Sequence, residues 1–93
     1  MVFIVSEIGV NWNGDLDIAE KMIKKSKEAG CNAVKFQAFN EKNIEGHPEK
    51  ERLLSCAINK QNIQIIDKIA RDADIEWFCT PMYSNAVELL EPF

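Results

Sequence analysis

The sequence predicts an α/β fold, a βαβαβα segment whose three strands are parallel. Short apolar runs that suit strands alternate along the chain with longer stretches in which apolar residues recur at helical spacing. Strands that alternate with helices are joined by right-handed crossovers, which place the strands parallel in one sheet. The chain has 93 residues with no internal repeat and no linker, so we expect one domain.

The first unit combines a short apolar strand with a clearly marked helix. Residues 2–5 are β-branched and aromatic, which is typical of a strand buried on both faces of a parallel sheet. Residues 15–29 carry apolar side chains at helical spacing. Asp15 is placed to act as the N-cap, and Gly30 stands where a left-handed residue ends a helix.

The second strand is predicted at residues 33–39, where the side chains alternate in character. Val34 and Phe36 point to one face, and Lys35 and Gln37 point to the other. The strand therefore has one apolar face and one polar face.

The rest of the chain continues the alternation. Helical spacing occurs in residues 49–58 and again in a segment that Asn59 can cap, which leaves open whether one bent helix or two helices form. Residues 75–79 predict the third strand, which Thr80-Pro81 ends because proline lacks a donor for the sheet. A last helix is expected at residues 84–90.

Three βα units can form a small three-layer domain or the opening part of a (β/α)8 TIM barrel, which typically has about 250 residues. The last helix is short, and nothing after it closes the sheet. The outer strands would then be exposed edges of an apolar sheet. We therefore expect residues 1–93 to be a partial TIM-barrel domain, the first three of eight units and the N-terminal fragment of a longer domain.

The composition argues against several classes of protein. Fifteen acidic and eleven basic residues give a net charge of −4, which disfavours a nucleic-acid partner. No apolar run is long enough to cross a membrane, and the apolar start lacks the basic region of a signal peptide. Three cysteines without a CxxC motif indicate free thiols in the cytoplasm. The single histidine, His47, lies in a polar loop and is expected to be solvated.

Candidate functional residues stand near the ends of the predicted strands, where parallel α/β folds place their sites. Glu7 ends the first strand, Lys35 and Gln37 share a face of the second, and Thr80 ends the third. An ammonium, an amide and a hydroxyl together suit an anionic, oxygen-rich substrate. Asn13 lies in the first loop, where an Asn-Gly turn is expected. The GxGxxG, P-loop, HExxH and GxSxG motifs are absent.

Three segments carry a resemblance to a known family. The runs SEIGVNWNGD, AGCNAVKFQAF and WFCTPM, in this order, resemble the sialic acid synthases, which include N-acetylneuraminate synthases and relatives that make legionaminic or pseudaminic acid. The resemblance implies a (β/α)8 barrel, usually followed by an antifreeze-like domain. It implies a transferase that condenses phosphoenolpyruvate with an N-acetylated amino sugar and releases phosphate, with a divalent metal, Mn²⁺ or Mg²⁺.

The resemblance also implies roles for single residues. Lys35 would hold the phosphoenolpyruvate anion, and Thr80 would help to bind its phosphate. Gln37 would contact the sugar, and Glu7 would lie near the sugar carbonyl and the metal. Asn13 would belong to the first active-site loop.

Two departures from the family pattern qualify these roles. Trp12 replaces the usual histidine of the Asn-His-Asn-Gly loop, and the metal-binding histidines of the family lie on later strands. We therefore expect no metal site and no complete catalysis in this chain alone. We also expect the full-length enzyme to be a homo-oligomer. Two alternatives stay open: a non-catalytic α/β binding or assembly module, and a barrel that uses phosphoenolpyruvate with a different sugar.

Overall fold

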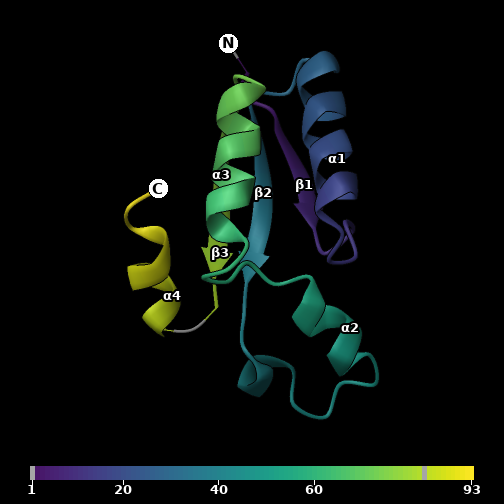
Figure 1. Cartoon of the computed structure of the whole chain (residues 1–93), viewed down its shortest axis with the longest axis vertical. Coiled ribbons are helices and arrows are strands. Elements are labelled where there is room, and N and C mark those ends of the chain that lie inside the picture. Colours follow the sequence, from purple (N-terminus) through teal and green to yellow (C-terminus); the bar gives the residue numbers. More distant parts are fainter. Residues whose placement is uncertain (1, 83) are drawn as a thin grey trace.

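A computed structural model of the chain describes residues 2–82 and 84–93. Three parallel strands form one sheet in the order β1-β2-β3, and helices alternate with them along the chain (Figure 1). In chain order the elements are β1 (Val5–Gly9), α1 (Leu16–Glu28), β2 (Ala33–Ala38), the 3-10 helix η1 (Glu41–Ile44), α2 (Lys50–Ser55), α3 (Ile63–Asp72), β3 (Glu76–Pro81) and α4 (Ser84–Leu90). The predicted α/β fold with three parallel strands is confirmed.

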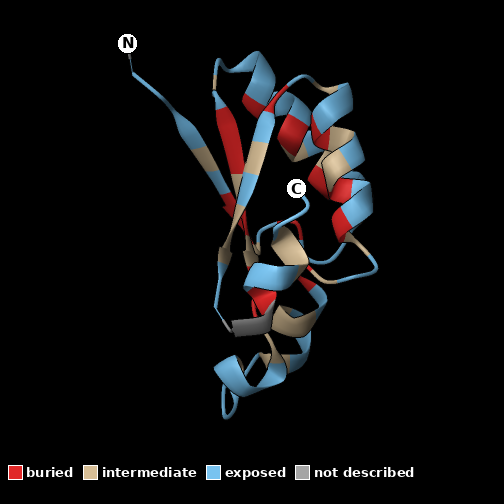
Figure 2. Ribbon diagram, turned by 90° about the vertical axis from the view of Figure 1, so that its left-hand side faces the viewer, coloured by how far each residue is buried: buried red, intermediate tan, exposed pale blue. Residues whose placement is uncertain are grey.

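The sheet has one covered face and one open face. Val34, Phe36 and Ala38 of β2 are buried, whereas Lys35 and Gln37 are partly exposed. Helices α1 and α3 pack on the face that contains Phe36, and no described element covers the opposite face (Figure 2). The predicted alternation of β2 is therefore confirmed, and its polar side chains point away from the helices.

Phe36 lies at the centre of the core under the helices. Trp12 from the β1–α1 loop packs edge-on against it with ring centroids 6.1 Å apart, and Trp77 of β3 does so at 6.3 Å. Ile23 of α1 and Ile66 of α3 are fully buried in the same cluster. Aromatic pairs of this geometry contribute about 0.5–1.5 kcal/mol each beyond their burial. Phe36 thus joins the first loop, the sheet and both covering helices.

The first strand lies further along the chain than the apolar run suggests. Pairing with β2 begins at Val5 opposite Ala33, and residues 2–4 are exposed. The prediction of a strand at residues 2–5, buried on both faces, was wrong. Upstream of Val5, Ile4 is hydrogen-bonded to Asn32, which lies before β2. One face of the sheet is open, so the apolar residues there are not buried on both faces. Hydrophobicity alone therefore placed the strand too early.

The ends of α1 follow from local signals. Asp15 Oδ1 accepts hydrogen bonds from the backbone N–H groups of Asp17 (2.9 Å) and Ile18 (3.3 Å), so Asp15 is the N-cap as predicted. Gly30 follows the helix with a φ of 91°, the left-handed conformation expected there. No helix in the described ranges 2–82 and 84–93 is long and apolar enough to cross a membrane.

Two separate helices, α2 and α3, occupy the long connection between β2 and β3. Asn59 Oδ1 accepts hydrogen bonds from the backbone N–H groups of Gln61 and Asn62, both at 2.9 Å, in the turn that leads into α3. This turn separates the helices and resolves the alternative that the helical spacing left open.

Residues 40–58, which contain η1 and α2, form a lobe beyond the carboxyl edge of the sheet (Figure 1). Ile58 N–H donates to the Gln37 carbonyl oxygen at 2.9 Å, which ties the end of the lobe to β2. Asn43 Nδ2 donates to the Met82 carbonyl oxygen at 3.0 Å, which ties its start to the chain after β3. We call this segment the η1–α2 lobe.

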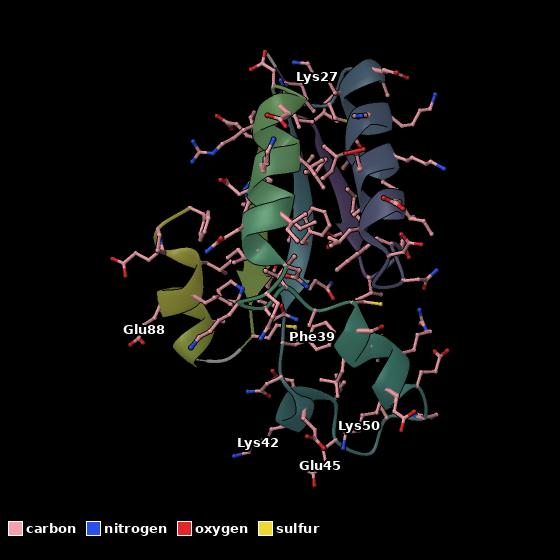
Figure 3. The ribbon with its side chains drawn as sticks, in the orientation of Figure 1. Lys27, Phe39, Lys42, Glu45, Lys50 and Glu88 are labelled. Atoms are coloured by element: carbon pink, nitrogen blue, oxygen red, sulfur yellow. The ribbon has the colours of Figure 1, made fainter. Side chains whose placement is uncertain are left out.

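Charged side chains gather at the outer end of the η1–α2 lobe. Figure 3 shows Lys42, Glu45 and Lys50 there, away from the sheet. Lys50 donates to Glu41 and holds the pKa of that carboxyl below its usual value. The pair is largely open to water, so it adds little to stability.

Gly14→Ala should destabilise the chain more than Gly30→Ala. Both glycines have positive φ, 73° and 91°, so alanine at either position costs about 1–2 kcal/mol. A Cβ atom at Gly14 would also lie 2.7 Å from the Ser55 carbonyl oxygen of α2, whereas one at Gly30 meets nothing within 4 Å. We expect urea denaturation to show a loss at least about 1 kcal/mol larger for Gly14→Ala, because the lobe must move. Equal losses would contradict this packing.

Candidate functional site

Four polar side chains lie on the open face near the carboxyl edge of the sheet. Glu7 of β1 stands opposite Lys35 of β2, and Gln37 of β2 stands opposite Thr80 of β3. Residues paired in this way across parallel strands point to the same face. The structure therefore brings together four of the five predicted site residues, which we call the open-face cluster.

Lys35 and Glu7 form an ion pair between neighbouring strands. Lys35 Nζ lies 3.9 Å from Glu7 Oε1, and the side chains are 34% and 50% exposed respectively. An ion pair this open to water contributes at most about 1 kcal/mol to stability. The stability of the ion pair therefore gives little reason for a lysine on the central strand. Its charge is better explained by contact with a ligand at this face.

A bulge at the end of β1 gathers the cluster. The register with β2 shifts between Glu7 and Gly9, and Gly9 has a φ of 55°. A Cβ atom at Gly9 would lie 3.8 Å from Gln37 Nε2 and 3.9 Å from Glu7 Cδ. The amide and the carboxylate therefore converge beside the Gly9 backbone. Bulges of this kind often redirect side chains at functional sites.

The cluster combines an ammonium, a carboxylate, an amide and a hydroxyl. The Lys35 ammonium can donate charge-assisted hydrogen bonds to phosphate or carboxylate oxygens. The Gln37 amide and the Thr80 hydroxyl can each donate and accept, so they can orient a ligand. The Glu7 carboxylate can accept a hydrogen bond or a proton. The arrangement can therefore bind a small anion and act on an oxygen beside it.

Cys79 precedes Thr80 on β3 but is not placed to act as a nucleophile. Burial raises the pKa of its thiol to about 12; the charge of Glu7 adds to this increase and the charge of Lys35 opposes it. Only the thiolate is nucleophilic. At neutral pH Cys79 therefore stays protonated, and its pairing with Phe36 points it to the helix-covered face of the sheet.

Asn13, the fifth predicted site residue, makes its side-chain contact outside the cluster. It lies in the β1–α1 loop, and its Oδ1 accepts a hydrogen bond from Arg52 Nη1 of α2 at 3.0 Å. Sequence reasoning missed Arg52, because an arginine among acidic residues on a short helix is usually a solvated group. No signal in the sequence links two residues 39 positions apart.

Trp12 lies in the core and not at the open face. Its side chain is 1% exposed and packs on Phe36, under the sheet on the helix side. Its Nε1 has no hydrogen-bond partner among the described residues. The tryptophan that departs from the family pattern therefore contributes to packing, and its ring does not enter the cluster.

The divalent metal that the resemblance implies does not find a complete set of ligands here. Within residues 2–82 and 84–93, no three His, Cys, Asp or Glu side chains are grouped so that they could hold one ion. In the cluster, the Glu7 carboxylate faces the Lys35 ammonium. The described residues of this chain therefore do not fit a metal site by themselves.

A parallel sheet with helices on one face and polar groups at its carboxyl edge defines an α/β protein with a candidate site at the strand ends. The family comparison makes this specific. Residues 22–93 match the model of the NeuB family, and the chain belongs to that family.

Relatives of this chain include sialic-acid-type synthases. The chain is 47% identical to the N-acetylneuraminate-9-phosphate synthase of Homo sapiens, over 95% of this chain and 29% of that protein. It is 31% identical to the N,N'-diacetyllegionaminic acid synthase of Campylobacter jejuni, over 94% of this chain and 31% of that protein. The resemblance to sialic acid synthases is confirmed.

A solved structure has the same fold over nearly all of this chain. It is the crystal structure of an N-acetylneuraminic acid (sialic acid) synthetase from Leptospira borgpetersenii in complex with citrate, with a TM-score of 0.86 and 29% identity. The match covers 98% of this chain and 33% of that one. The chain therefore spans about a third of the length of these relatives.

Cys79 should react slowly with iodoacetamide. With a thiol pKa of about 12, the thiolate fraction at pH 8 is about 10⁻⁴. We expect alkylation at pH 8, followed by mass spectrometry, to be at least about a hundredfold slower than in the urea-unfolded chain. The rate should keep rising up to about pH 11, whereas a plateau between pH 8 and 10 would show that the thiol is not shifted in this way.

Proposed function

We propose that this chain forms the first three βα units of the barrel of a sialic-acid-type synthase. The enzyme would condense phosphoenolpyruvate with an N-acetylated amino sugar, form a nonulosonic acid and release phosphate. The observation that carries the proposal is the open-face cluster: an ammonium, a carboxylate, an amide and a hydroxyl from three neighbouring strands meet at the carboxyl edge of a parallel sheet.

In this proposal Lys35 and Thr80 bind phosphoenolpyruvate. Lys35 lies on the central strand, with a strand on each side, so its ammonium can reach an anion above the middle of the sheet. A phosphate or carboxylate oxygen would accept charge-assisted hydrogen bonds from it, each worth about 1.5–3 kcal/mol. The Thr80 hydroxyl, one strand away, would donate to the phosphate.

Glu7 and Gln37 would serve the sugar and the moving proton. The methylene carbon of phosphoenolpyruvate bonds to the aldehyde carbon of the open-chain sugar, and the aldehyde oxygen gains a proton. Water adds at the phosphate-bearing carbon, and phosphate leaves. Glu7 can relay one proton of that water to the aldehyde oxygen, and the other proton leaves with the phosphate. The Gln37 amide beside Gly9 can hold a sugar oxygen. The metal that the family resemblance implies would need ligands from outside this chain.

The same open face bears on the rival interpretation, a non-catalytic binding or assembly module. Phe78 of β3 and Val5 of β1 are 44% and 38% exposed, so the sheet offers apolar surface to further units or to another copy. A module that only assembles gives no reason for Lys35 on the central strand, so we favour the synthase. A homo-oligomer belongs to the same proposal. So does a cytoplasmic location, which the free cysteines favour.

Lys35→Met should lower kcat/KM for phosphoenolpyruvate by at least about tenfold in the complete synthase, which corresponds to about 1.4 kcal/mol. Methionine keeps most of the stem and removes the charge, and the ion pair with Glu7 is too exposed to affect folding much. Steady-state kinetics at saturating sugar and metal, together with the melting temperature, measure this effect.

Lys60→Met is the matched control, since Lys60 is exposed in the turn before α3. It should leave both kinetics and melting unchanged. If a well-folded Lys35→Met enzyme kept its phosphoenolpyruvate kinetics, Lys35 would not be in the site and the proposed function would lose its main support.

The 93-residue chain alone should associate in a concentration-dependent way. Each outer strand, β1 and β3, pairs on one side only, and Phe78 of β3 is exposed on the open face. Analytical ultracentrifugation should show species larger than the 10.6 kDa monomer. Phe78→Lys should reduce association, whereas Ile65→Lys on the outside of α3 should not. A compact monomer at high concentration would refute this expectation.

A further inference from the structure

We propose that Arg52 is a positioning residue that orients the Asn13 carboxamide, so that the Asn13 NH₂ group donates a hydrogen bond to a substrate oxygen. The inference rests on the proposed function and adds a residue of the η1–α2 lobe to the site. It joins two segments that the sequence separates by 39 positions.

The hydrogen bond between the two residues determines which way the amide lies. Arg52 Nη1 donates to Asn13 Oδ1 at 3.0 Å. A guanidinium has only donors, so turning the amide over would place its NH₂ group against N–H groups. Asn13 Nδ2 has no hydrogen-bond partner within the part of the chain that the structure describes. The amide therefore keeps its oxygen on Arg52 and leaves its donor free.

The guanidinium is itself held in place. Arg52 Nε lies 3.1 Å from Glu49 Oε1, and its Nη2 lies 3.4 Å from Glu49 Oε2. A two-point contact of this kind favours one plane of the guanidinium. In that plane Arg52 presents Nη1 to Asn13.

The backbone of the first loop is fixed against the same helix. Asn13 has a φ of 53°, and a Cβ atom at the next residue, Gly14, would lie 2.7 Å from the Ser55 carbonyl oxygen. Arg52 and Ser55 are three residues apart on α2, so they lie on the same side of the helix. One side of α2 thus contacts both the backbone of the loop and its Asn13 side chain.

The loop lies where a substrate oxygen can meet it. It begins directly after Gly9, beside Glu7 and Gln37, and two backbone hydrogen bonds keep it tight, Asn11 N–H to the Ile8 carbonyl and Asn13 N–H to the Val10 carbonyl. Asn13 therefore stands at the same edge of the sheet as the open-face cluster. Its NH₂ group suits an acceptor oxygen, which either substrate can supply.

A double-mutant cycle in the complete synthase tests the proposal. Arg52→Met and Asn13→Ala should each lower kcat/KM by at least about fivefold, for phosphoenolpyruvate or for the sugar, and the substrate affected identifies the oxygen. In the Asn13→Ala background, Arg52→Met should change kcat/KM by less than about twofold, because Arg52 acts through Asn13. Additive losses would overturn the proposal.

Conservative variants separate positioning from a structural role. Asn13→Asp keeps an oxygen for Arg52 and removes the NH₂ donor, so it should lower kcat/KM by at least about fivefold without lowering the melting temperature. Arg52→Lys keeps a donor for Asn13 Oδ1 but loses the two-point contact with Glu49, so its kcat/KM should lie between those of the unaltered enzyme and Arg52→Met. Full activity of Asn13→Asp would overturn the proposal, even if Arg52→Met proved unstable.

Arg71→Met is the matched control. Arg71 is the other arginine of the chain and also pairs with an acid of its own helix, Asp67 at 2.7 Å. It should leave kcat/KM unchanged; a loss as large as that of Arg52→Met would count against a specific role for Arg52. If Lys35→Met lowers activity while the Arg52 cycle is additive, only this inference fails; if Lys35→Met has no effect, the proposed function fails first.

Discussion

The two-sided character of β2 is the constraint on which both the core and the site depend. Because the strand is central, each of its faces must be either packed or used. Phe36 and its apolar neighbours on one face bring α1, α3 and two tryptophans together. Lys35 and Gln37 on the other face cannot be covered by an apolar helix without the cost of burying an unpaired charge and an amide. The sheet therefore stays open where the polar groups lie.

The η1–α2 lobe is the second organising feature, because it follows β2 and contacts the segments that follow β1 and β3. It contacts the first loop through Arg52 and Ser55, continues from β2, and meets the chain after β3 through Asn43. Loops that each belong to one βα unit are usually independent surface segments. Here one lobe links them, so a substitution on α2 can affect the edge at which the open-face cluster lies.

Much of the candidate site could be predicted from the sequence because strands follow a period of two. Once β2 is recognised, Lys35 and Gln37 must share a face, and parallel pairing brings Glu7 and Thr80 beside them. The bulge at Gly9, the contact of Asn13 with Arg52 and the inward position of Trp12 could not be predicted. Each depends on a partner distant in the sequence, and neither hydropathy nor spacing encodes such a partner.

The sequence by itself determined the order of the elements, the cap and the end of α1, the two faces of β2 and the family. These features depend on local backbone preferences and on short periodicities, which act within a few residues. Only the tertiary structure decided where β1 begins, that α2 and α3 are separate helices, and that Trp12 lies in the core while Asn13 faces α2. A strand begins where a neighbour can accept its hydrogen bonds, and a loop side chain points to whatever packs against it. Both outcomes are set by distant parts of the chain that meet only in the folded protein.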